Sequence, residues 1–359
     1  MEGGGAPDDV IDVRPDERFD EAALAAWLAG RLEGAAAPLR VRQFGGGHAN
    51  LTYLLRFGAD EGAVLRVLRR PPLGPVAAGA HDMRREHRVL ARLWRGFAPA
   101  PRALLYCDDA SVIGAPFFVM EHRPGVVVRG GRVPERFGGG RDAEANRRLS
   151  EALVDALARL HAVDAGAVGL GDLGRPEGFL ERQVRGWCER WEAARTGELA
   201  VADEVARWLD AERPRVDPAP TLVHNDWKLD NLAVAPDDPG RCVAVYDWDM
   251  CTRGDPLCDL GTLFAMWSEP GEPPAGTDPM PSRAPGFLRR AEAARRYAEA
   301  SGRALDALDY YLVFGCFKMA VVLQQIFVRW RRGQTRDARF AGLGAAAEDL
   351  FRLAAARRP

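Results

Sequence analysis

The first third of the chain is dominated by short stretches in which apolar and polar residues alternate. A period of two residues is typical of half-buried β-strands. It runs through both arms of residues 41–56, which meet at a triple glycine, and through Ala63–Arg70, which ends at two prolines. Two further apolar runs, Ala103–Cys107 and Phe117–Glu121, have the length of strands. The pattern therefore predicts a small β-rich region on the N-terminal side of the chain.

Helical spacing of apolar residues takes over in the rest of the sequence. Leu149, Leu153, Leu157 and Leu160 recur three or four positions apart within residues 142–161, which predicts the main buried helix of this region. The other expected helices are residues 18–32, 81–94, 178–195, 201–212, 287–301, 304–331 and 337–357. The later part of the chain is therefore expected to be α-rich, with a Gly- and Arg-rich loop at residues 126–140.

A polar loop between two apolar runs carries the most distinctive chemistry. Residues 224–231 follow a short apolar strand, and a second apolar run, Val243–Tyr246, ends at Asp247. We expect a hairpin that brings Asp226, Asn231 and Asp247 around one small space. One carboxylate to accept a proton, with an amide oxygen and a second carboxylate to hold Mg²⁺, is what phosphoryl transfer from a nucleotide needs. Any single Asp or Asn would more often be a turn residue, so the interpretation depends on the whole set.

Three motifs in this stretch resemble those of a known family. They are His224-x-Asp226-x4-Asn231, Asp247-Trp248-Asp249 and Gly254-Asp255-Pro256-x2-Asp259-Leu260. Residues 41–264 thereby resemble the aminoglycoside phosphotransferase-like, or choline kinase-like, branch of the protein-kinase fold. Within that branch the chain is most similar to the kinase-like domain fused to some acyl-CoA dehydrogenases and to its free-standing bacterial relatives.

The resemblance implies an α+β fold with two lobes. Residues 1–36 would be a flexible N-terminus and a leading helix, residues 37–122 a small β-rich N-lobe, and residues 123–359 a large helical C-lobe that also binds the acceptor. ATP would lie in the cleft between the lobes. Mg²⁺ would be held at Asn231 and Asp247.

The same resemblance assigns roles around the polar loop. Asp226 would be the base, and Lys228 would lie over the γ-phosphate, although a solvated loop lysine is the alternative. Asp249 would add an outer contact to the metal, and His224 is expected to support the loop through a hydrogen bond. Asp259, with Asp255, is expected to brace the loop and cap the following helix.

Several residues of the N-lobe are expected to bind the nucleotide. Gly45, Gly46 and Gly47 form a hairpin tip without Cβ atoms, so that backbone N–H groups can approach phosphate oxygens. A glycine-rich hairpin alone would usually be only a turn, and its position ahead of the other motifs supports the interpretation. Glu121 and His122 lie where the family has the hinge that meets the adenine edge.

The phosphate-gripping cation departs from the family pattern. No lysine precedes Lys228, so Arg69 takes the position of the usual lysine on its strand, with Arg66 as the alternative. Both could instead be solvated strand arginines. Glu86, on the next helix, is expected to pair with Arg69, against the alternative of a solvated surface glutamate. An arginine keeps the charge, but its planar fork is not equivalent to an ammonium group.

Composition excludes several other classes of function. The chain has 359 residues and a formal net charge of −2, which gives no global attraction to nucleic acid or membranes. Its six cysteines show no metal-binding spacing, which favours buried thiols in a reducing cytoplasm. The longest apolar stretch, Tyr310–Val328, contains a lysine and two glutamines and is expected to be a core helix. No signal peptide is recognised, and we expect a cytoplasmic monomer or homodimer.

These features predict an ATP- and Mg²⁺-dependent phosphotransferase that acts on a hydroxyl group of a small molecule. A protein substrate is not favoured, because no activation segment separates Asp249 from Gly254. The acceptor is expected to be anionic, such as a hydroxyacyl-CoA, or else an aminoglycoside-like compound. The alternative is a pseudokinase, a nucleotide-binding or scaffold module without transfer activity, which the missing lysine motivates.

Overall fold

The computed structural model describes residues 10–45, 50–59, 62–74, 81–214, 219–272, 280–335 and 337–359. The chain divides into two compact units. The first contains the residues up to Pro124 together with Ala244–Met250, and the second contains Gly125–Val243 and Cys251–Pro359. The short segment Ala244–Met250, which includes the Asp247 motif, therefore belongs to the first unit although it comes late in the chain.

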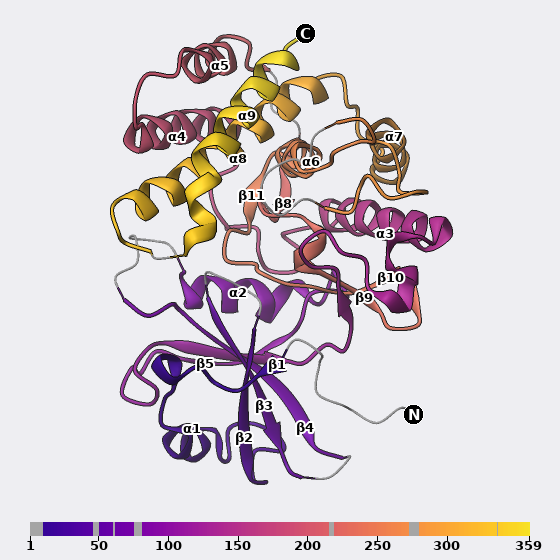
Figure 1. Cartoon of the computed structure of the whole chain (residues 1–359). Helices are drawn as coiled ribbons and strands as arrows, with labels where there is room; N and C mark the ends of the chain where they lie inside the picture. The colour runs from indigo at the N-terminus through magenta and orange to yellow at the C-terminus, as the bar shows by residue number, and fades with distance from the viewer. Residues whose placement is uncertain are drawn as a thin grey trace. The chain divides into compact units, whose positions relative to one another are not determined.

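The first unit consists mostly of strands, and the second is mostly helical (Figure 1). The strands are β1 (Val10–Ile11), β2 (Leu39–Phe44), β3 (Leu51–Phe57), β4 (Val64–Arg70), β5 (Ala103–Cys107), β6 (Phe117–Glu121), β7 (Val126–Val127), β8 (Thr221–Val223), β9 (Leu232–Ala235), β10 (Asp238–Val245) and β11 (Thr252–Gly254). The α-helices are α1 (Glu21–Leu28), α2 (Met83–Leu93), α3 (Ala143–His161), α4 (Phe179–Ala194), α5 (Ala200–Ala211), α6 (Pro256–Ala265), α7 (Arg290–Ser301), α8 (Leu308–Arg331) and α9 (Leu343–Ala356). Short 3₁₀ turns occur at Pro15–Glu17, Glu135–Gly140, Leu229–Asn231 and Ala338–Gly342.

A six-stranded sheet forms the first unit, in the order β1-β2-β3-β4-β6-β5. The expected hairpin of residues 41–56 is present, since β2 and β3 pair antiparallel with Val41 opposite Leu55. Strand β4 pairs with β3 on one side and with β6 on the other. Asp82 caps the N-terminus of helix α2, since its carboxylate accepts a hydrogen bond from the N–H of Arg85, and the helix packs against β5 and β6.

The second unit is built around α8, which packs against α4, α5, α6 and α9. Its two small sheets have the orders β10-β9-β7 and β11-β8. Residues 126–140, expected to be a loop, contain β7 and a 3₁₀ turn, because Val126 and Val127 pair with Val234 and Ala233 of β9.

The expected hairpin between the two apolar runs of the polar-loop region is wrong. Strand β8 pairs with β11, where Val223 lies opposite Thr252, and β10 pairs with β9. The physical reason is a third apolar run: Leu232–Ala235 is fully buried and forms a strand of its own, β9. The residue patterns of the three runs are alike, so periodicity alone did not select the partners.

Helix α8 contains the longest apolar stretch of the chain. Among the described residues it is the one helix long and apolar enough to cross a membrane. However, 67% of its most apolar window is buried inside the protein, as in the core helix of a soluble protein. Two polar side chains of this helix, Lys318 and Gln324, are themselves buried. The expectation of a core helix agrees with this burial.

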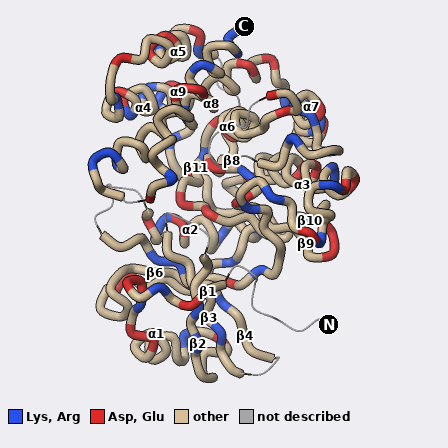
Figure 2. The backbone as a smooth tube through the Cα atoms, in the orientation of Figure 1, with Lys and Arg blue, Asp and Glu red and all other residues tan. Residues whose placement is uncertain are grey.

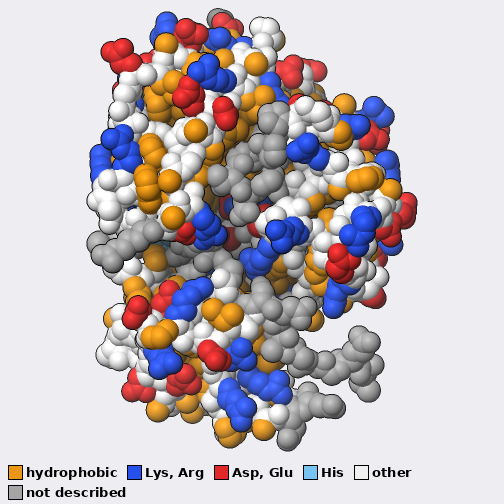
Figure 3. Space-filling view, viewed as in Figure 1, with side chains coloured by type: hydrophobic (Ala, Val, Ile, Leu, Met, Phe, Trp, Pro, Cys, Tyr) orange, Lys and Arg blue, Asp and Glu red, His pale blue; other side chains and the backbone are white. Residues whose placement is uncertain are grey.

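Charged residues of both signs are interspersed along the two units. Figure 2 shows acidic and basic positions next to one another on α3 and α7. On the face drawn in Figure 3, basic, acidic and apolar side chains alternate over the coloured surface. This distribution matches the formal net charge of −2. All six cysteines are free thiols, and all except Cys188 are buried.

Candidate active site

The loop after β8 alternates between buried and partly exposed side chains. Trp227 and Leu229 are buried, and the indole N–H of Trp227 donates to the carbonyl of Leu153 at 3.1 Å. Asp226 and Lys228 lie between these anchors, with side chains 28% and 29% exposed. The apolar residues therefore hold the loop on the core and leave the two charged side chains accessible.

Two neighbours hold the Asp226 carboxylate. The ammonium group of Lys228 lies 2.9 Å from Oδ2 and 3.0 Å from Oδ1. The amide nitrogen of Asn231 donates to Oδ2 at 2.8 Å and to the Asp226 carbonyl at 2.9 Å. The nitrogen of Asn231 is thus committed to Asp226, so its amide oxygen is the atom it can offer to a cation. Three of the predicted site residues are brought together in the second unit.

The backbone of this loop is braced by a buried carboxylate from α6. Asp259 accepts hydrogen bonds from the N–H of His224 at 2.7 Å and from the N–H of Asn225 at 2.6 Å. His224 in turn accepts from the N–H of Asp226 through Nδ1 at 3.2 Å. The expected support of the loop by His224 is therefore present.

Asp255 and Asp259 have different roles. Asp255 caps α6 by accepting from the N–H of Leu257 at 2.9 Å, and it also contacts the hydroxyl of Tyr311. Asp259 lies inside α6 and accepts hydrogen bonds from the backbone of the loop. The sequence placed both residues correctly as structural support but did not distinguish the cap from the brace.

His161, at the end of α3, completes the buried network behind the loop. Its Nε2 lies 3.2 Å from Asp259 and its Nδ1 lies 2.7 Å from the hydroxyl of Tyr297. Burial lowers the pKa of His161, and Arg303 and His224 lower it further, whereas Asp259 raises it. The neutral imidazole is therefore favoured in the folded chain.

The free energy of unfolding is expected to decrease as the pH falls below 6.5, the ordinary pKa of histidine. Because the folded chain disfavours the protonated form of His161, the unfolded chain takes up the proton first, so the stabilisation is complete above that pKa and is lost below it. If the unfolded chain binds one proton more than the folded chain, the free energy of unfolding changes by about 1.4 kcal/mol per pH unit. Urea unfolding at about pH 7.5 and about pH 5 should show a weaker pH dependence in His161→Gln than in the native chain. If the free energy of unfolding changed equally with pH in the native chain and in His161→Gln, the assignment of this pH dependence to His161 would be contradicted.

A second cluster of predicted residues lies in the first unit. Arg69 of β4 and Glu86 of α2 are buried, and Arg69 Nε lies 3.2 Å from Glu86 Oε2. The Arg69 guanidinium also donates to Asp247 Oδ1 at 2.7 Å. Glu86 accepts from the N–H of Trp248 at 3.2 Å, which ties α2 to the segment that carries Asp247. Arg66 instead donates to the carbonyl of Leu65, so Arg69 is the arginine that pairs with Glu86.

Arg69 thus forms ion pairs with two carboxylates, those of Glu86 and Asp247. Burial raises the pKa of Glu86 to about 7; Arg69 acts against this shift, and Asp247 and Asp249 add to it. Asp247 itself has a positive φ of 65°, a conformation uncommon for residues other than glycine. The Asp247 carboxylate, 30% exposed, is therefore held at the surface of the first unit by Arg69.

The remaining residues predicted to bind the nucleotide or the metal each have different neighbours. Asp249 lies 3.9 Å from the ring of His81. The carboxylate of Glu121 accepts from the N–H of Arg102 and from Arg123, and His122 follows directly after β6. The carbonyl of Gly45 accepts from Arg14 at 3.1 Å, whereas Gly46 and Gly47 lie outside the described residues.

The candidate metal ligands suit Mg²⁺ in their chemistry. They are the carboxylates of Asp247 and Asp249 in the first unit and the amide oxygen of Asn231 in the second. Within the described part of the chain, no three His, Cys, Asp or Glu side chains form a preassembled metal cluster. Magnesium binds hard oxygen ligands, usually with one or two protein carboxylates and the remainder from phosphates and water. The donor set therefore fits this ion better than zinc or another thiophilic metal.

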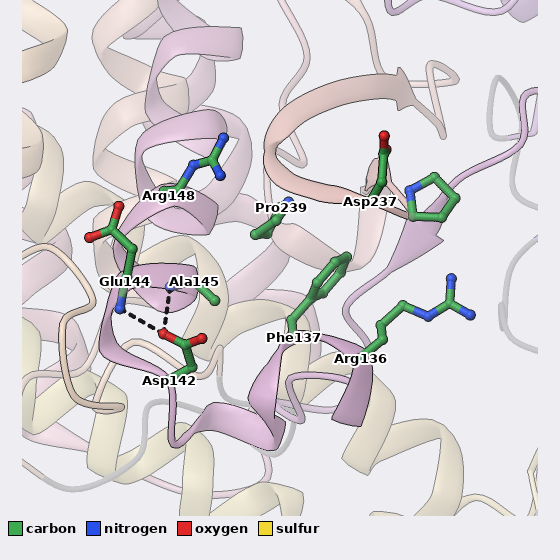
Figure 4. Close-up of a pocket in the computed structure, with 9 residues that line it drawn as sticks. Arg136, Phe137, Asp142, Glu144, Ala145, Arg148, Asp237 and Pro239 are labelled. Carbon is green, nitrogen blue, oxygen red and sulfur yellow. Dashed lines mark hydrogen bonds between the residues drawn. The ribbon is translucent and has the colours of Figure 1, made fainter.

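A cavity of about 350 Å³ lies apart from these residues, between the start of α3 and the β9–β10 turn (Figure 4). Its lining includes Phe137, Arg148 and Asp237 but none of the predicted site residues. The carboxylate of Asp142 at its edge caps α3 through the N–H groups of Glu144 and Ala145. We assign no chemistry to this cavity.

Sequence reasoning missed one residue near the loop. Lys318 of α8 donates to the carbonyl of Asn225 at 2.7 Å, directly before Asp226. In the sequence, Lys318 stood out only as a polar interruption of an apolar helix. A lone buried lysine was the available signal, but nothing in the pattern indicated its partner.

The chain is similar to parts of several curated proteins. It is 33% identical over 334 residues to acyl-CoA dehydrogenase family member 11 of Gallus gallus, covering 90% of this chain and 41% of that protein. It is 31% identical over 346 residues to acyl-CoA dehydrogenase family member 10 of Mus musculus, covering 95% of this chain and 31% of that protein. The chain therefore spans about two fifths or less of the length of these relatives.

Solved structures match over almost the whole chain. A crystal structure from Ralstonia eutropha, provisionally described as an aminoglycoside phosphotransferase, is 30% identical with a TM-score of 0.80, covering 95% of this chain and 98% of that one. A thermostable mutant of the aminoglycoside phosphotransferase APH(4)-Ia, in a ternary complex with AMP-PNP and hygromycin B, is 16% identical with a TM-score of 0.60, covering 93% and 98%. These matches confirm the expected α+β, protein-kinase-like fold.

A family model provides the remaining comparison. The model described as "Phosphotransferase enzyme family" matches residues 40–311, which include strands β3 to β6 and nearly all of β2, the polar loop and both motifs that follow it. The match agrees with the aminoglycoside phosphotransferase-like resemblance and with the similarity to acyl-CoA dehydrogenase family members 10 and 11. The chain therefore belongs to the phosphotransferase enzyme family.

Proposed function

We propose that the chain transfers the γ-phosphoryl group of ATP to a hydroxyl group of a small molecule. The observation that carries this proposal is the Asp226 carboxylate, partly exposed and held by Lys228 and Asn231 on a braced loop. A carboxylate held in this way can accept the proton of the attacking hydroxyl while the oxygen of that hydroxyl forms a bond to the γ-phosphorus. The bond from that phosphorus to the bridging oxygen breaks, and the electron pair leaves with ADP.

Cationic side chains supply the charge that the transferred group requires. Lys228 lies beside Asp226 and would stabilise the negative charge that spreads over the phosphoryl oxygens. Arg69 would bind the α- and β-phosphates through its planar fork, with Glu86 fixing its direction. Backbone N–H groups of Gly45, Gly46 and Gly47 would cover the phosphates, and Glu121 and His122 would meet the adenine edge.

Asn231 and Asp247 would hold Mg²⁺, and Asp249 would make an outer contact. When bound, this ion neutralises charge on the β- and γ-phosphates. The oxygen-only donor set supports this assignment, as does the commitment of the Asn231 nitrogen to Asp226.

We propose an anionic acceptor, with a hydroxyacyl-CoA as the leading class. Similarity to acyl-CoA dehydrogenase family members 10 and 11 supports this choice, and so does the mixture of arginines with acids on the described surface. An aminoglycoside is a polycation, and a pocket for it should be rich in carboxylates. Aminoglycosides remain the second acceptor class, supported by the fold shared with phosphotransferases of such drugs.

One observation favours a different function, that of a pseudokinase. Arg69 stands in place of the usual lysine and is bound by both Glu86 and Asp247, so the phosphate-binding cation and a metal ligand neutralise each other. In that case the chain would bind a nucleotide, or act as a scaffold, without transfer.

Release of ADP from Mg·ATP by the purified full chain separates the two functions. The assay is run with water alone and then with hydroxyacyl-CoA thioesters, sugar acids and aminoglycosides as acceptors. The proposed function predicts ADP release that one acceptor class accelerates, with a phosphorylated product of matching mass. Binding of ATP without ADP release for any acceptor would favour the pseudokinase instead.

A further inference from the structure

Lys318 is a buried lysine that the proposed reaction does not use. It lies in the middle of the apolar helix α8 and is only 5% exposed. Burial lowers its pKa, whereas Asp259 and Asp226 raise it. Because an ammonium group without water is costly unless it is hydrogen-bonded, the partner of this side chain matters for the fold.

The partner of Lys318 is the backbone of the candidate catalytic loop. Its Nζ donates to the carbonyl of Asn225 at 2.7 Å, and the N–H of the same residue donates to Asp259 at 2.6 Å. Both polar backbone groups of Asn225 are therefore held by buried side chains, the amine of Lys318 and the carboxylate of Asp259. One comes from α8 and the other from α6.

Asn225 needs such support because its backbone conformation is unfavourable. Its φ is 68°, in the left-handed region that residues with a Cβ rarely adopt. A conformation of this kind costs on the order of 1–3 kcal/mol and persists only where surrounding contacts enforce it. Asn225 directly precedes Asp226, so the orientation of its peptide groups sets the direction in which the Asp226 carboxylate leaves the chain.

The two helices that supply the clamp are packed with their backbones in close approach. A Cβ on Gly315 would lie 2.3 Å from the carbonyl oxygen of Gly261, and a Cβ on Gly261 would lie 2.2 Å from that of Tyr311. Lys318 follows Gly315 by nearly one helical turn, and Asp259 precedes Gly261 by two residues. Close-packed helices resist sliding, so both charges are presented to the loop from a rigid support.

We propose that Lys318 is a positioning residue: together with Asp259 it clamps Asn225 and so aims the Asp226 carboxylate at the attacking hydroxyl. This inference rests on the proposed function. Lys318 touches neither nucleotide nor acceptor in this account and acts only through the loop. Displacing a reacting group by about 1 Å can lower a rate by about 10²-fold, so loss of the clamp should affect turnover more than nucleotide affinity.

Helix α8 also offers a matched control, Gln324. This residue is likewise 5% exposed, and its amide donates to the carbonyl of Ala194 at 3.0 Å, away from the loop. Lys318→Met and Gln324→Met each remove one buried donor from the same helix. For ADP release from Mg·ATP, Lys318→Met is expected to lower kcat about 10- to 100-fold with KM for ATP within about threefold. Gln324→Met should leave kcat unchanged, and Lys318→Arg, which keeps a donor, should restore part of the loss.

Amide hydrogen exchange tests the clamp without relying on turnover. In Lys318→Met, exchange should accelerate in residues 222–231, whereas in Gln324→Met this segment should remain protected. If Lys318→Met does not fold, Lys318→Gln is tested for the same two results. Unchanged kcat together with unchanged exchange would overturn the proposal, as would an equal loss of kcat in the Gln324 variant. A native chain that releases no ADP with any acceptor would remove the proposed function, and the exchange result would still decide whether Lys318 holds the loop.

Discussion

Replacing Asp226 by asparagine is expected to lower kcat for ADP release by about 10²- to 10⁴-fold, the usual contribution of a general base. Asparagine has nearly the same shape but cannot accept the proton of the attacking hydroxyl. The affinity for Mg·ATP should change little, because Asp226 is not among the candidate nucleotide or metal ligands. Turnover is measured by a coupled ADP assay and affinity by calorimetric titration.

Asp230 provides the matched control for this substitution. It lies on the same loop, and its carboxylate accepts a hydrogen bond from the backbone N–H of Gly130 at 3.3 Å. Asp230→Asn removes a negative charge from the same loop and should retain most of the turnover. Equal losses in the two variants would mean that the charge of the loop, and not proton acceptance by Asp226, determines the rate.

Replacing Asp259 by alanine is expected to lower the free energy of unfolding by about 3–5 kcal/mol, the range seen when one partner of a buried charged network is removed. The substitution leaves the N–H groups of His224 and Asn225 without their acceptor in a buried site. It also removes the carboxylate that raises the pKa of Lys318 most strongly. Urea unfolding of the native and variant chains measures the difference.

Asp155 serves as the surface control for Asp259. It forms a bidentate ion pair with Arg296 at 2.6 and 2.8 Å, but its side chain is 39% exposed. Exposed ion pairs contribute about 1 kcal/mol or less, so Asp155→Ala should have a small effect. A loss for Asp259→Ala no larger than that for Asp155→Ala would show that Asp259 does not brace the loop.

Residue patterns predicted local structure well where the period of the apolar residues and the length of the segment favoured the same type of element. Strands β5 and β6 have the predicted bounds, α3 begins one residue later than predicted, and α4 is one residue shorter than predicted at each end. Strand β6 is an apolar run that is buried along almost its whole length, and α3 and α4 bury apolar residues at helical spacing, so the hydrophobic pattern specifies these segments. The pairing of Arg69 with Glu86 was also predicted, because the family pattern places a cation and a glutamate on neighbouring elements.

Pairing between distant segments could not be predicted in the same way. The short apolar runs Leu222–Val223, Leu232–Ala235 and Val243–Tyr246 have similar patterns, and only the folded chain shows that β8 pairs with β11. Two glycines that allow α6 and α8 to approach closely have no signature in periodicity. For the same reason the contact between Lys318 and Asn225, 93 residues apart, was not foreseen.

Thermal unfolding with Mg·ATP, compared with ATP plus a chelator, tests the central claim most directly. The native chain and Asp226→Asn should both show a Mg²⁺-dependent rise in Tm, corresponding to about 2.7 kcal/mol at a hundredfold excess over Kd. Asp247→Ala should lose that rise, because it removes a proposed metal ligand. A native chain whose Tm responds to no nucleotide, with or without Mg²⁺, would contradict the account.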